Sequence, residues 1–294
     1  MAKHPKRCGN TFFSNKICIV IVKAISLHSV IPVRVEPKES AEQSTQILFG
    51  DTCTIIEQIP RWNRVKLDLD GQEGWVDSKM ITPMAKEEYA SYVADYSKAA
   101  YVLYPIAYAV SANNSQTIPL TAGTRLTKYQ NGQFQILGVS FRIDPSMVVQ
   151  QPMPMNDQNL IQTIRFFLNI PYLWGGKNAL GMDCSGFTQT ILSLFGKHIL
   201  RNASEQATQG RKISTLQKAK AGDLVFFAHY NDKQQEEKIT HVGILLDAER
   251  VVHCSGRVKV EKIDNTGIFS VEQANKEHPN GQYTHRLLQI RRYF

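Results

Sequence analysis

The sequence has no run of apolar residues long enough for a membrane-spanning helix, which needs ~18 to 20 of them. It also lacks long low-complexity segments, and 43% hydrophobic with 20% charged residues is typical of a chain that folds throughout. Because domains typically contain ~100 to 200 residues, we expect more than one domain in 294 residues.

Cysteine is scarce, and its pattern matches neither a disulfide framework nor a metal site. A chain of this size needs no disulfide bonds for stability, so we expect a reducing, cytoplasmic compartment. Basic residues and an apolar run at 17–22 superficially resemble a secretory signal, but Lys23 interrupts the run and no clear cleavage site follows. Export by an atypical signal is the alternative. The five cysteines are Cys8, Cys18, Cys53, Cys184 and Cys254.

Basic residues are not concentrated in any one segment. The formal net charge of +8 comes from Lys and Arg scattered along the chain, whereas nucleic-acid binding usually needs them gathered on one surface. We therefore expect no nucleic-acid partner and a solvated basic surface. Binding of an anionic ligand is the alternative.

Short β-type runs broken by turn residues fill the N-terminal half. They predict a first small barrel over 17–83 after a tail at 1–16, with its first strand at 17–27 and a hairpin at Asp70-Gly71. Residues 86–98 lack Gly and Pro, which indicates a linker helix within 84–98. Turns at 113–114 and 131–132 predict a second barrel over 99–144. The proline-rich segment 145–155 is predicted as a linker that is neither helical nor central in a sheet.

Residues 156–294 are predicted to form an α+β domain, in which helices precede strands. A helix is expected from about Asp157 to Asn169, with Asn156 or Asp157 as its cap. In a second helix, Phe187, Ile191, Leu194 and Phe195 share one face, and Gly196 ends it. Antiparallel strands are predicted at 223–227, 241–246, 251–255 and 258–263.

Cys184 falls in the first turn of that second helix. A thiolate is the nucleophilic form of cysteine, and a helix N-terminus lowers the thiol pKa because its backbone N–H groups favour negative charge. The alternative is a small buried apolar residue. The position after a Gly-Gly loop, between Asp183 and Ser185, argues against burial.

His241 is the candidate base for this nucleophile, because it opens a strand after a polar loop. His253 follows on the next strand. Side chains alternate along strands, so the two rings share a face only if the turn centres near Ala248, with His253 opposite Gly243. His253 would then orient His241, although two unrelated strand histidines are the alternative.

No other histidine has a comparable setting beside the nucleophile, and we predict that the rest are structural or surface residues. A zinc site from Cys184, His241, His253 and Cys254 is a disfavoured alternative, because neither Cys-x-x-Cys nor His-x-x-x-His spacing occurs. We expect no metal and no cofactor. The remaining histidines are His4, His28, His198, His229, His278 and His285.

Six motifs in order resemble the NlpC/p60 family of papain-like cell-wall hydrolases. Upstream, Arg34–Pro37, Thr45–Asp51, Trp62 and Gly74-Trp75-Val76 resemble a bacterial SH3-like domain. The whole is most similar to the γ-D-glutamyl-L-diamino-acid endopeptidases. The six motifs are Tyr172-Leu173-Trp174-Gly175-Gly176, Asp183-Cys184-Ser185-Gly186-Phe187, Arg201-Asn202-Ala203-Ser204-Glu205-Gln206, Ala221-Gly222-Asp223-Leu224-Val225-Phe226-Phe227, His241-Val242-Gly243-Ile244 and His253-Cys254-Ser255-Gly256.

The resemblance implies a papain-like domain behind two SH3-like barrels, and a Cys-His-His triad. Tyr172 would be an oxyanion donor, although packing roles for Tyr172 and Trp174 are alternatives. Glu42, in the first barrel, would receive a free amine. The implied catalytic residues are Cys184, His241, His253 and Tyr172, and the implied substrate-binding residues are Trp174, Asp183, Ser185, Asn202, Ala203 and Glu42.

The sequence departs from the family pattern at three places. Asn202-Ala203 stands where members selective for a free L-Ala amine often have Asp-Ser, and Gln72 or Glu73 stands where they have Tyr. Cys254 replaces a more usual Ala and is interpreted as a packing residue.

The expected function is cleavage of the γ-D-Glu–diamino-acid bond of peptidoglycan stem peptides, with preference for a free N-terminal L-Ala. The partners would be muropeptides, bound by a monomer without an integral membrane segment. An amidase or acyltransferase on the same scaffold, or a non-catalytic wall-binding protein, are the alternatives.

Overall fold

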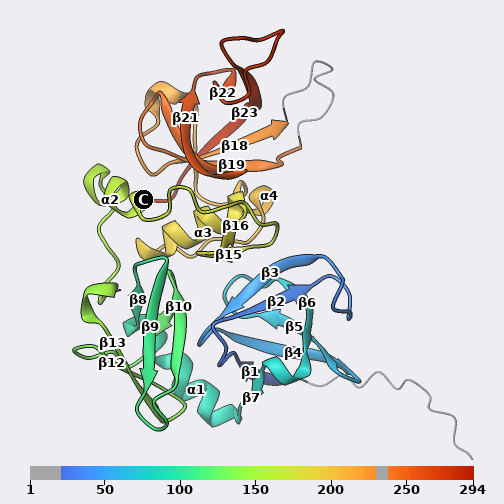
Figure 1. Ribbon diagram of the computed structural model, residues 1–294, viewed down its shortest axis with the longest axis vertical. Helices are drawn as coiled ribbons and strands as arrows, with labels where there is room; N and C mark the ends of the chain where they lie inside the picture. The colour runs from blue at the N-terminus through green and yellow to red at the C-terminus, as the bar shows by residue number, and fades with distance from the viewer. Residues whose placement is uncertain (1–20, 230–237) are drawn as a thin grey trace, which may run out of the picture.

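The computed structural model describes residues 21–229 and 238–294 (Figure 1). The predicted tail, the beginning of the first predicted strand, Cys8, Cys18 and His4 lie outside these residues. No helix within them combines the length and apolarity needed to cross a membrane.

The first β unit is an antiparallel seven-stranded sheet in the order β3-β2-β6-β5-β4-β1-β7. Its alternating apolar residues, such as Ile31, Val33 and Val65, form a separate core. The predicted hairpin at Asp70-Gly71 is confirmed, because it joins the paired strands β5 and β6. The strands are β1 (Val22–Ile25), β2 (Val30–Arg34), β3 (Gln43–Leu48), β4 (Thr52–Ile59), β5 (Trp62–Leu67), β6 (Glu73–Asp77) and β7 (Thr82–Pro83), with a 3₁₀ helix η1 (Ser78–Met80) before β7.

The predicted linker helix is shorter than expected. Helix α1 (Lys86–Ala94) ends at Asp95, and a 3₁₀ helix η2 (Tyr96–Lys98) follows. The hydroxyls of Tyr92 and Tyr96 both donate to the carbonyl oxygen of Gly50, at 2.9 and 3.0 Å. These two bonds fix both tyrosines on the first β unit at the point where the helix changes.

The second β unit contains a four-stranded sheet, β10-β9-β13-β12, and a three-stranded sheet, β11-β8-β14. Phe49 of the first unit packs edge-on against Phe134 and Phe141, so the two units share this core. The strands are β8 (Ala100–Val102), β9 (Ile106–Ser111), β10 (Thr117–Thr121), β11 (Arg125–Leu126), β12 (Gln133–Ile136), β13 (Val139–Ile143) and β14 (Val148–Val149).

The linker prediction for 145–155 is wrong at its beginning. A 3₁₀ helix η3 (Pro145–Met147) is followed by β14, which pairs with β8. Pro145 is tolerated because the first turn of a helix leaves its N–H positions without partners anyway. Asp144 caps this turn by accepting from the backbone N–H of Ser146 at 2.9 Å.

In the part of the C-terminal unit that the structure describes, there are three α-helices and a large antiparallel sheet in the order β17-β23-β18-β19-β20-β21-β22. Because β22 also pairs with β23, strands β18 to β23 close into a ring. The elements are α2 (Asp157–Arg165), β15 (Lys177–Asn178), β16 (Gly181–Met182), α3 (Cys184–Leu194), α4 (Ala203–Gln206), β17 (Arg211–Ile213), the 3₁₀ helix η4 (Leu216–Lys218), β18 (Leu224–His229), β19 (His241–Leu245), β20 (Arg250–Ser255), β21 (Arg257–Ile263), β22 (Gly267–Ser270) and β23 (Gln282–Arg292).

Both predicted helices of this unit are present. Asn156 caps α2 by accepting from the backbone N–H of Asn159, but α2 ends at Arg165 rather than Asn169, because the next residues form tighter i−3 bonds. Helix α3 begins at Cys184, and Gly196 follows it with φ +76°. The predicted α+β class with an all-β N-terminal region is confirmed.

Helix α3 is buried on nearly all sides. In Figure 1 it lies between the C-terminal sheet and the two β units. Its N-terminal end therefore faces a region to which both the sheet and the first β unit contribute.

Candidate active site

Cys184 is the first residue of α3 and is only 7% exposed. The expectation that it avoids burial is wrong, because the helix start is covered by β19 and β20. Burial raises the pKa of the Cys184 thiol to about 12, and the neighbouring Asp183 carboxylate adds to this. Hydrogen bonds from the backbone N–H groups of Val242 and Ser185 oppose the increase without reversing it.

A hydrogen-bond contact joins the rings of His241 and His253, which lie nearly perpendicular to each other. His241 Nε2 lies 2.8 Å from His253 Nδ1, and both rings are buried. The predicted register is confirmed, because His253 is paired with Gly243 and Leu245 with Val251, which centres the turn at residue 248. A Cβ on Gly243 would lie 3.1 Å from that of His253, so the glycine leaves room for the ring.

Glu261 on β21 extends this chain of contacts. Its Oε2 lies 2.8 Å from His253 Nε2, and its other oxygen accepts from Ser270 and lies 3.1 Å from Lys259 Nζ. Burial alone would raise the pKa of Glu261, but the hydrogen bonds from His253 and Ser270 outweigh it and bring the pKa to about 2.

The carboxylate determines the tautomers of both rings. An ionised carboxylate only accepts hydrogen bonds, so His253 carries its proton on Nε2 and its Nδ1 accepts from His241 Nε2–H. The Nδ1 of His241 is then left as an acceptor. Sequence reasoning did not predict Glu261. Strand alternation could have indicated it, because Glu261 lies two residues from Lys259, the strand partner of His253, and therefore on the same face of the sheet.

His285 on β23 lies beside this pair. Its ring centroid is 4.2 Å from that of His241, and it stacks on His229 at 5.9 Å. From the sequence, His285 is expected to be a structural or surface residue, and its position beside His241 is not predicted. Only the closure of the ring by β23, a long-range pairing, brings it there.

Burial favours the neutral forms of His241, His253 and His285. It lowers the pKa of His241 well below its usual value, and His285 and His253 lower it further. Burial likewise lowers the pKa of His285 to about 3. It also lowers the pKa of His253, although Glu261 acts in the opposite direction. Burial thus favours the neutral forms of the Cys184 thiol and the His241 imidazole, which line the same cavity.

A cavity of about 570 Å³ opens over Cys184 and His241. Trp174 is 60% exposed, which rules out the alternative that it is a core aromatic. Burial, followed by the nearby Cys184, raises the pKa of Tyr172. The predicted residues that line the cavity are Tyr172, Trp174, Asp183, Cys184, Ser185, Asn202, Ala203 and His241; His285, His229 and Ser44 line it as well.

Buried Arg201, which sequence reasoning did not single out, holds the start of α3. Its guanidinium donates to both oxygens of Asp183, at 2.9 and 2.6 Å, and to Ser185 Oγ at 2.8 Å. Asp183 also accepts from the backbone N–H groups of Gly175 and Gly186. Both carboxylate oxygens of Asp183 therefore accept hydrogen bonds from groups of the protein itself.

The first β unit walls one side of the cavity. Arg201 Nε donates to Thr45 Oγ1 at 2.8 Å, and Gln43 Nε2 donates to the carbonyl oxygen of Trp174 at 3.1 Å. Gly175 has φ +72°, and a Cβ there would lie 2.5 Å from the Gln43 carbonyl oxygen, so only glycine allows this approach. Glu42 does not line the cavity, but its Oε1 accepts from Trp174 Nε1 at 2.6 Å.

Cys254 is fully buried, and its Sγ lies 3.1 Å from the Met182 carbonyl oxygen. This contact fits the interpretation of Cys254 as a packing residue. Within 21–229 and 238–294, no group of three or more His, Cys, Asp or Glu side chains is arranged to hold a metal ion.

Comparison with known proteins agrees with this arrangement. A model described as "NlpC/P60 family" matches residues 169–276, and one described as "Bacterial dipeptidyl-peptidase Sh3 domain" matches residues 33–81. The γ-D-glutamyl-L-lysine dipeptidyl-peptidase of Bacillus subtilis is 32% identical over 221 residues, covering 71% of each chain. The chain belongs to the NlpC/P60 family.

Other family members extend the likeness. The γ-D-glutamyl-L-lysine dipeptidyl-peptidase of Bacillus cereus is 29% identical over 71% of this chain and 66% of its own length. The crystal structure of an NlpC/P60 family protein from Bacillus cereus superposes with a TM-score of 0.73 at 20% identity, covering 92% of this chain and 99% of its own. This superposition supports the three-unit fold.

Proposed function

We propose that this NlpC/P60 protein is a cysteine endopeptidase that cleaves the γ-D-Glu–diamino-acid bond of peptidoglycan stem peptides. The observation that carries the proposal is the line of contacts from Glu261 through His253 to His241, next to Cys184 in a 570 Å³ cavity. Two relatives named γ-D-glutamyl-L-lysine dipeptidyl-peptidase support the substrate class.

In the first step, the Cys184 sulfur attacks the γ-carbonyl carbon of D-Glu while His241 Nδ1 takes the thiol proton. The resulting His241 imidazolium donates a hydrogen bond to His253. The negative charge of Glu261, on the far side of His253, stabilises the imidazolium. The backbone N–H groups at the start of α3 and the Tyr172 hydroxyl are the proposed donors to the developing oxyanion.

In the second step, His241 gives its proton to the departing diamino-acid amine, which leaves a thioester on Cys184. Water then enters, and His241 removes a proton from it as it attacks the thioester carbonyl. The thiol is restored and L-Ala-γ-D-Glu is released. No step uses a metal or an organic cofactor.

Glu42 is proposed to select substrates with a free N-terminal amine. Trp174 holds one oxygen of its carboxylate, and the second oxygen is a suitable acceptor for an ammonium group. Asn202 and Ala203 line the active-site cavity, which Glu42 does not, and they are the further residues of the proposed substrate site. A cytoplasmic compartment and the absence of a nucleic-acid partner are proposals that rest on the cysteine and charge patterns. A monomeric state is proposed as well, without support from these patterns.

Product analysis tests this function. L-Ala-γ-D-Glu-diaminopimelate, its L-Lys counterpart and their N-acetylated forms are incubated with the protein and with Cys184→Ala, and products are identified by mass spectrometry. We expect L-Ala-γ-D-Glu from the free-amine peptides and none with Cys184→Ala. Cleavage at another bond, or acyl transfer to an added amine, would favour the amidase or transferase alternative.

A further inference from the structure

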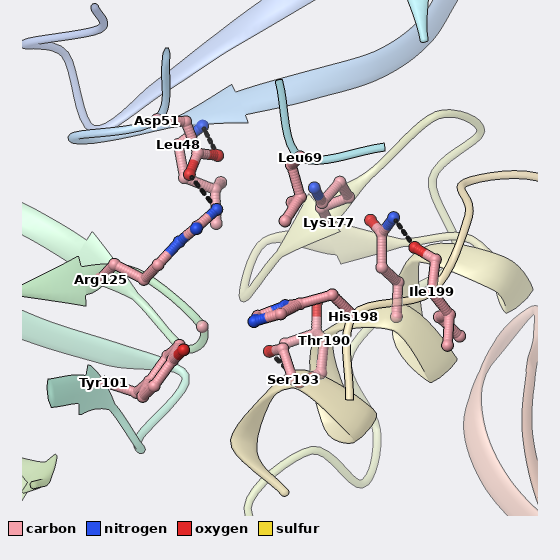
Figure 2. Close-up of a pocket in the computed structure, with 12 residues that line it drawn as sticks. Leu48, Asp51, Leu69, Tyr101, Arg125, Lys177, Thr190, Ser193, His198 and Ile199 are labelled. Atoms are coloured by element: carbon pink, nitrogen blue, oxygen red, sulfur yellow. Dashed lines mark hydrogen bonds and ion pairs between the residues drawn. The ribbon is translucent and has the colours of Figure 1, made fainter. Parts of the chain in front are cut away.

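A second cavity lies where the three units meet, away from Cys184. It is lined by residues from the middle and the C-terminal part of α3, including Gln189 and Ser193, whereas the active-site cavity is at the N-terminal end of the helix. Figure 2 shows Arg125, Lys177 and His198 reaching toward the same space from different elements. The volume of this inner cavity is about 20 Å³, enough for about one water-sized group, such as one oxygen of a bound molecule.

Lys177 is the unusual residue of this cavity. It is only 2% exposed, and its Nζ has no hydrogen-bond partner in the described part of the chain. Burial lowers its pKa, and the charges of Asp70 and Asp51 act in the opposite direction. A desolvated ammonium without an acceptor is unfavourable, so a bound group that accepts from it would stabilise the site.

The carboxylates near Lys177 already have other partners. Asp51 accepts from the backbone N–H of Leu48 at 3.1 Å and pairs with Arg125 at 3.5 Å. Asp70 accepts from Gln189 Nε2 at 3.0 Å and from the backbone N–H of Gln72. Neither carboxylate makes a hydrogen bond to Lys177 Nζ in the described residues, so the site can take an acceptor from a bound molecule.

An adjoining outer cavity of about 350 Å³ shares Tyr101, Arg125 and His198 with the inner one. Lys98 and Tyr96 also line it, and none of its lining residues is acidic. The guanidinium of Arg125 lies over the Tyr96 ring, 4.3 Å from its centroid. The outer cavity thus combines positive charge with aromatic surface and has the size of a small-ligand site.

We propose that these joined cavities bind a small anionic molecule. Its carboxylate or phosphate group contacts Lys177 and Arg125, and its body lies in the outer cavity against Tyr96 and Tyr101. The unsatisfied Gln189 Oε1 takes a hydrogen bond from a hydroxyl of the ligand or from a water beside it. Because the lining comes from all three units, the ligand stabilises their packing, and this proposal does not depend on the peptidase activity.

The test measures the melting temperature of the full chain against inorganic phosphate or succinate, each exchanged for sodium chloride at constant ionic strength. The variants are Lys177→Met and, as a control, Lys128→Met, which removes an exposed cation of the second β unit outside both cavities. We expect a saturable increase for the wild type, at least a tenfold weaker apparent affinity for Lys177→Met, and no change for Lys128→Met.

The two probes distinguish the ligand chemistry, because phosphate reports an oxyanion and succinate a carboxylate. Lys98→Gln at the outer cavity is the second variant if Lys177→Met does not fold, and it should weaken the same response. A wild-type melting temperature that responds to neither probe, or equally in all variants, would overturn the proposal.

Discussion

Glu261 Oε2 accepts a hydrogen bond from His253 Nε2 across 2.8 Å, out of contact with the Cys184 thiol that it serves. The contact determines which nitrogen of His253 carries a proton, and through it the protonation of His241. Glu261 is thus a positioning residue for the proposed reaction rather than a group that touches substrate.

Glu261→Gln tests this positioning. Loss of the carboxylate removes the charge that stabilises the His241 imidazolium, so kcat should fall by about 10- to 100-fold, as for other residues that orient a reactive group from behind it. The KM should change little. Glu272→Gln is the control, because Glu272 contacts Lys259 and Arg257 but not the histidines. Equal activity of Glu261→Gln and the wild type would exclude the role.

The same carboxylate predicts how stability depends on pH. The pKa of Glu261 is about 2 when folded, below the ordinary 4.5. Its stabilising contribution is therefore present above pH 4.5 and is lost as the pH falls toward 2. Over this pH range, the free energy of unfolding measured in urea should decrease by about 1 to 3 kcal/mol more for the wild type than for Glu261→Gln. An equal decrease in the free energy of unfolding of the two proteins with falling pH would contradict the assignment.

Arg201→Met should destabilise the protein strongly. It leaves Asp183 buried without its charged partner, a change that costs about 3 to 5 kcal/mol. Thr45→Val removes only one hydrogen bond from the Arg201 guanidinium and should cost less, about 1.5 to 3 kcal/mol. Urea unfolding measures both. If Arg201→Met lost no more than Thr45→Val, the ion pair would not hold the start of α3.

The rate at which Cys184 is alkylated should have the pH dependence of a buried, neutral thiol. With its pKa raised to about 12, the thiolate fraction grows about tenfold per pH unit over the neutral range. The rate of iodoacetamide labelling at Cys184 should therefore increase steadily from pH 6 to 9. A rate that is already constant at pH 6 would mean that a thiolate–imidazolium pair exists in the free enzyme.

Glu42→Gln should affect only substrates with a free amine. The substitution removes the charge that is proposed to bind the ammonium of L-Ala, so KM should increase about tenfold, equivalent to about 1.4 kcal/mol, while kcat changes little. The N-acetylated substrate supplies the control, since it carries no ammonium. A KM that is unchanged for the free-amine peptide would exclude Glu42 from recognition.

Local patterns predicted the parts of the site that depend on neighbouring residues. The start of α3 and the His253–Gly243 pairing follow from helical periodicity and strand alternation, and both are confirmed. His285 and Arg201 were not predicted. The position of His285 depends on ring closure by β23, and that of Arg201 depends on packing between units. The burial of Cys184 escaped for the same reason, since the strands that cover it lie far along the chain.

The central claim is that Cys184 forms a covalent acyl intermediate. Rapid acid quenching of the wild type with L-Ala-γ-D-Glu-diaminopimelate, followed by peptide mass mapping, tests it most directly. We predict that the peptide containing Cys184 gains the mass of the L-Ala-γ-D-Glu acyl group and that the peptide containing Cys254 does not. Substrate turnover without any acyl adduct on Cys184, under conditions in which the thioester step is slowed, would contradict the account.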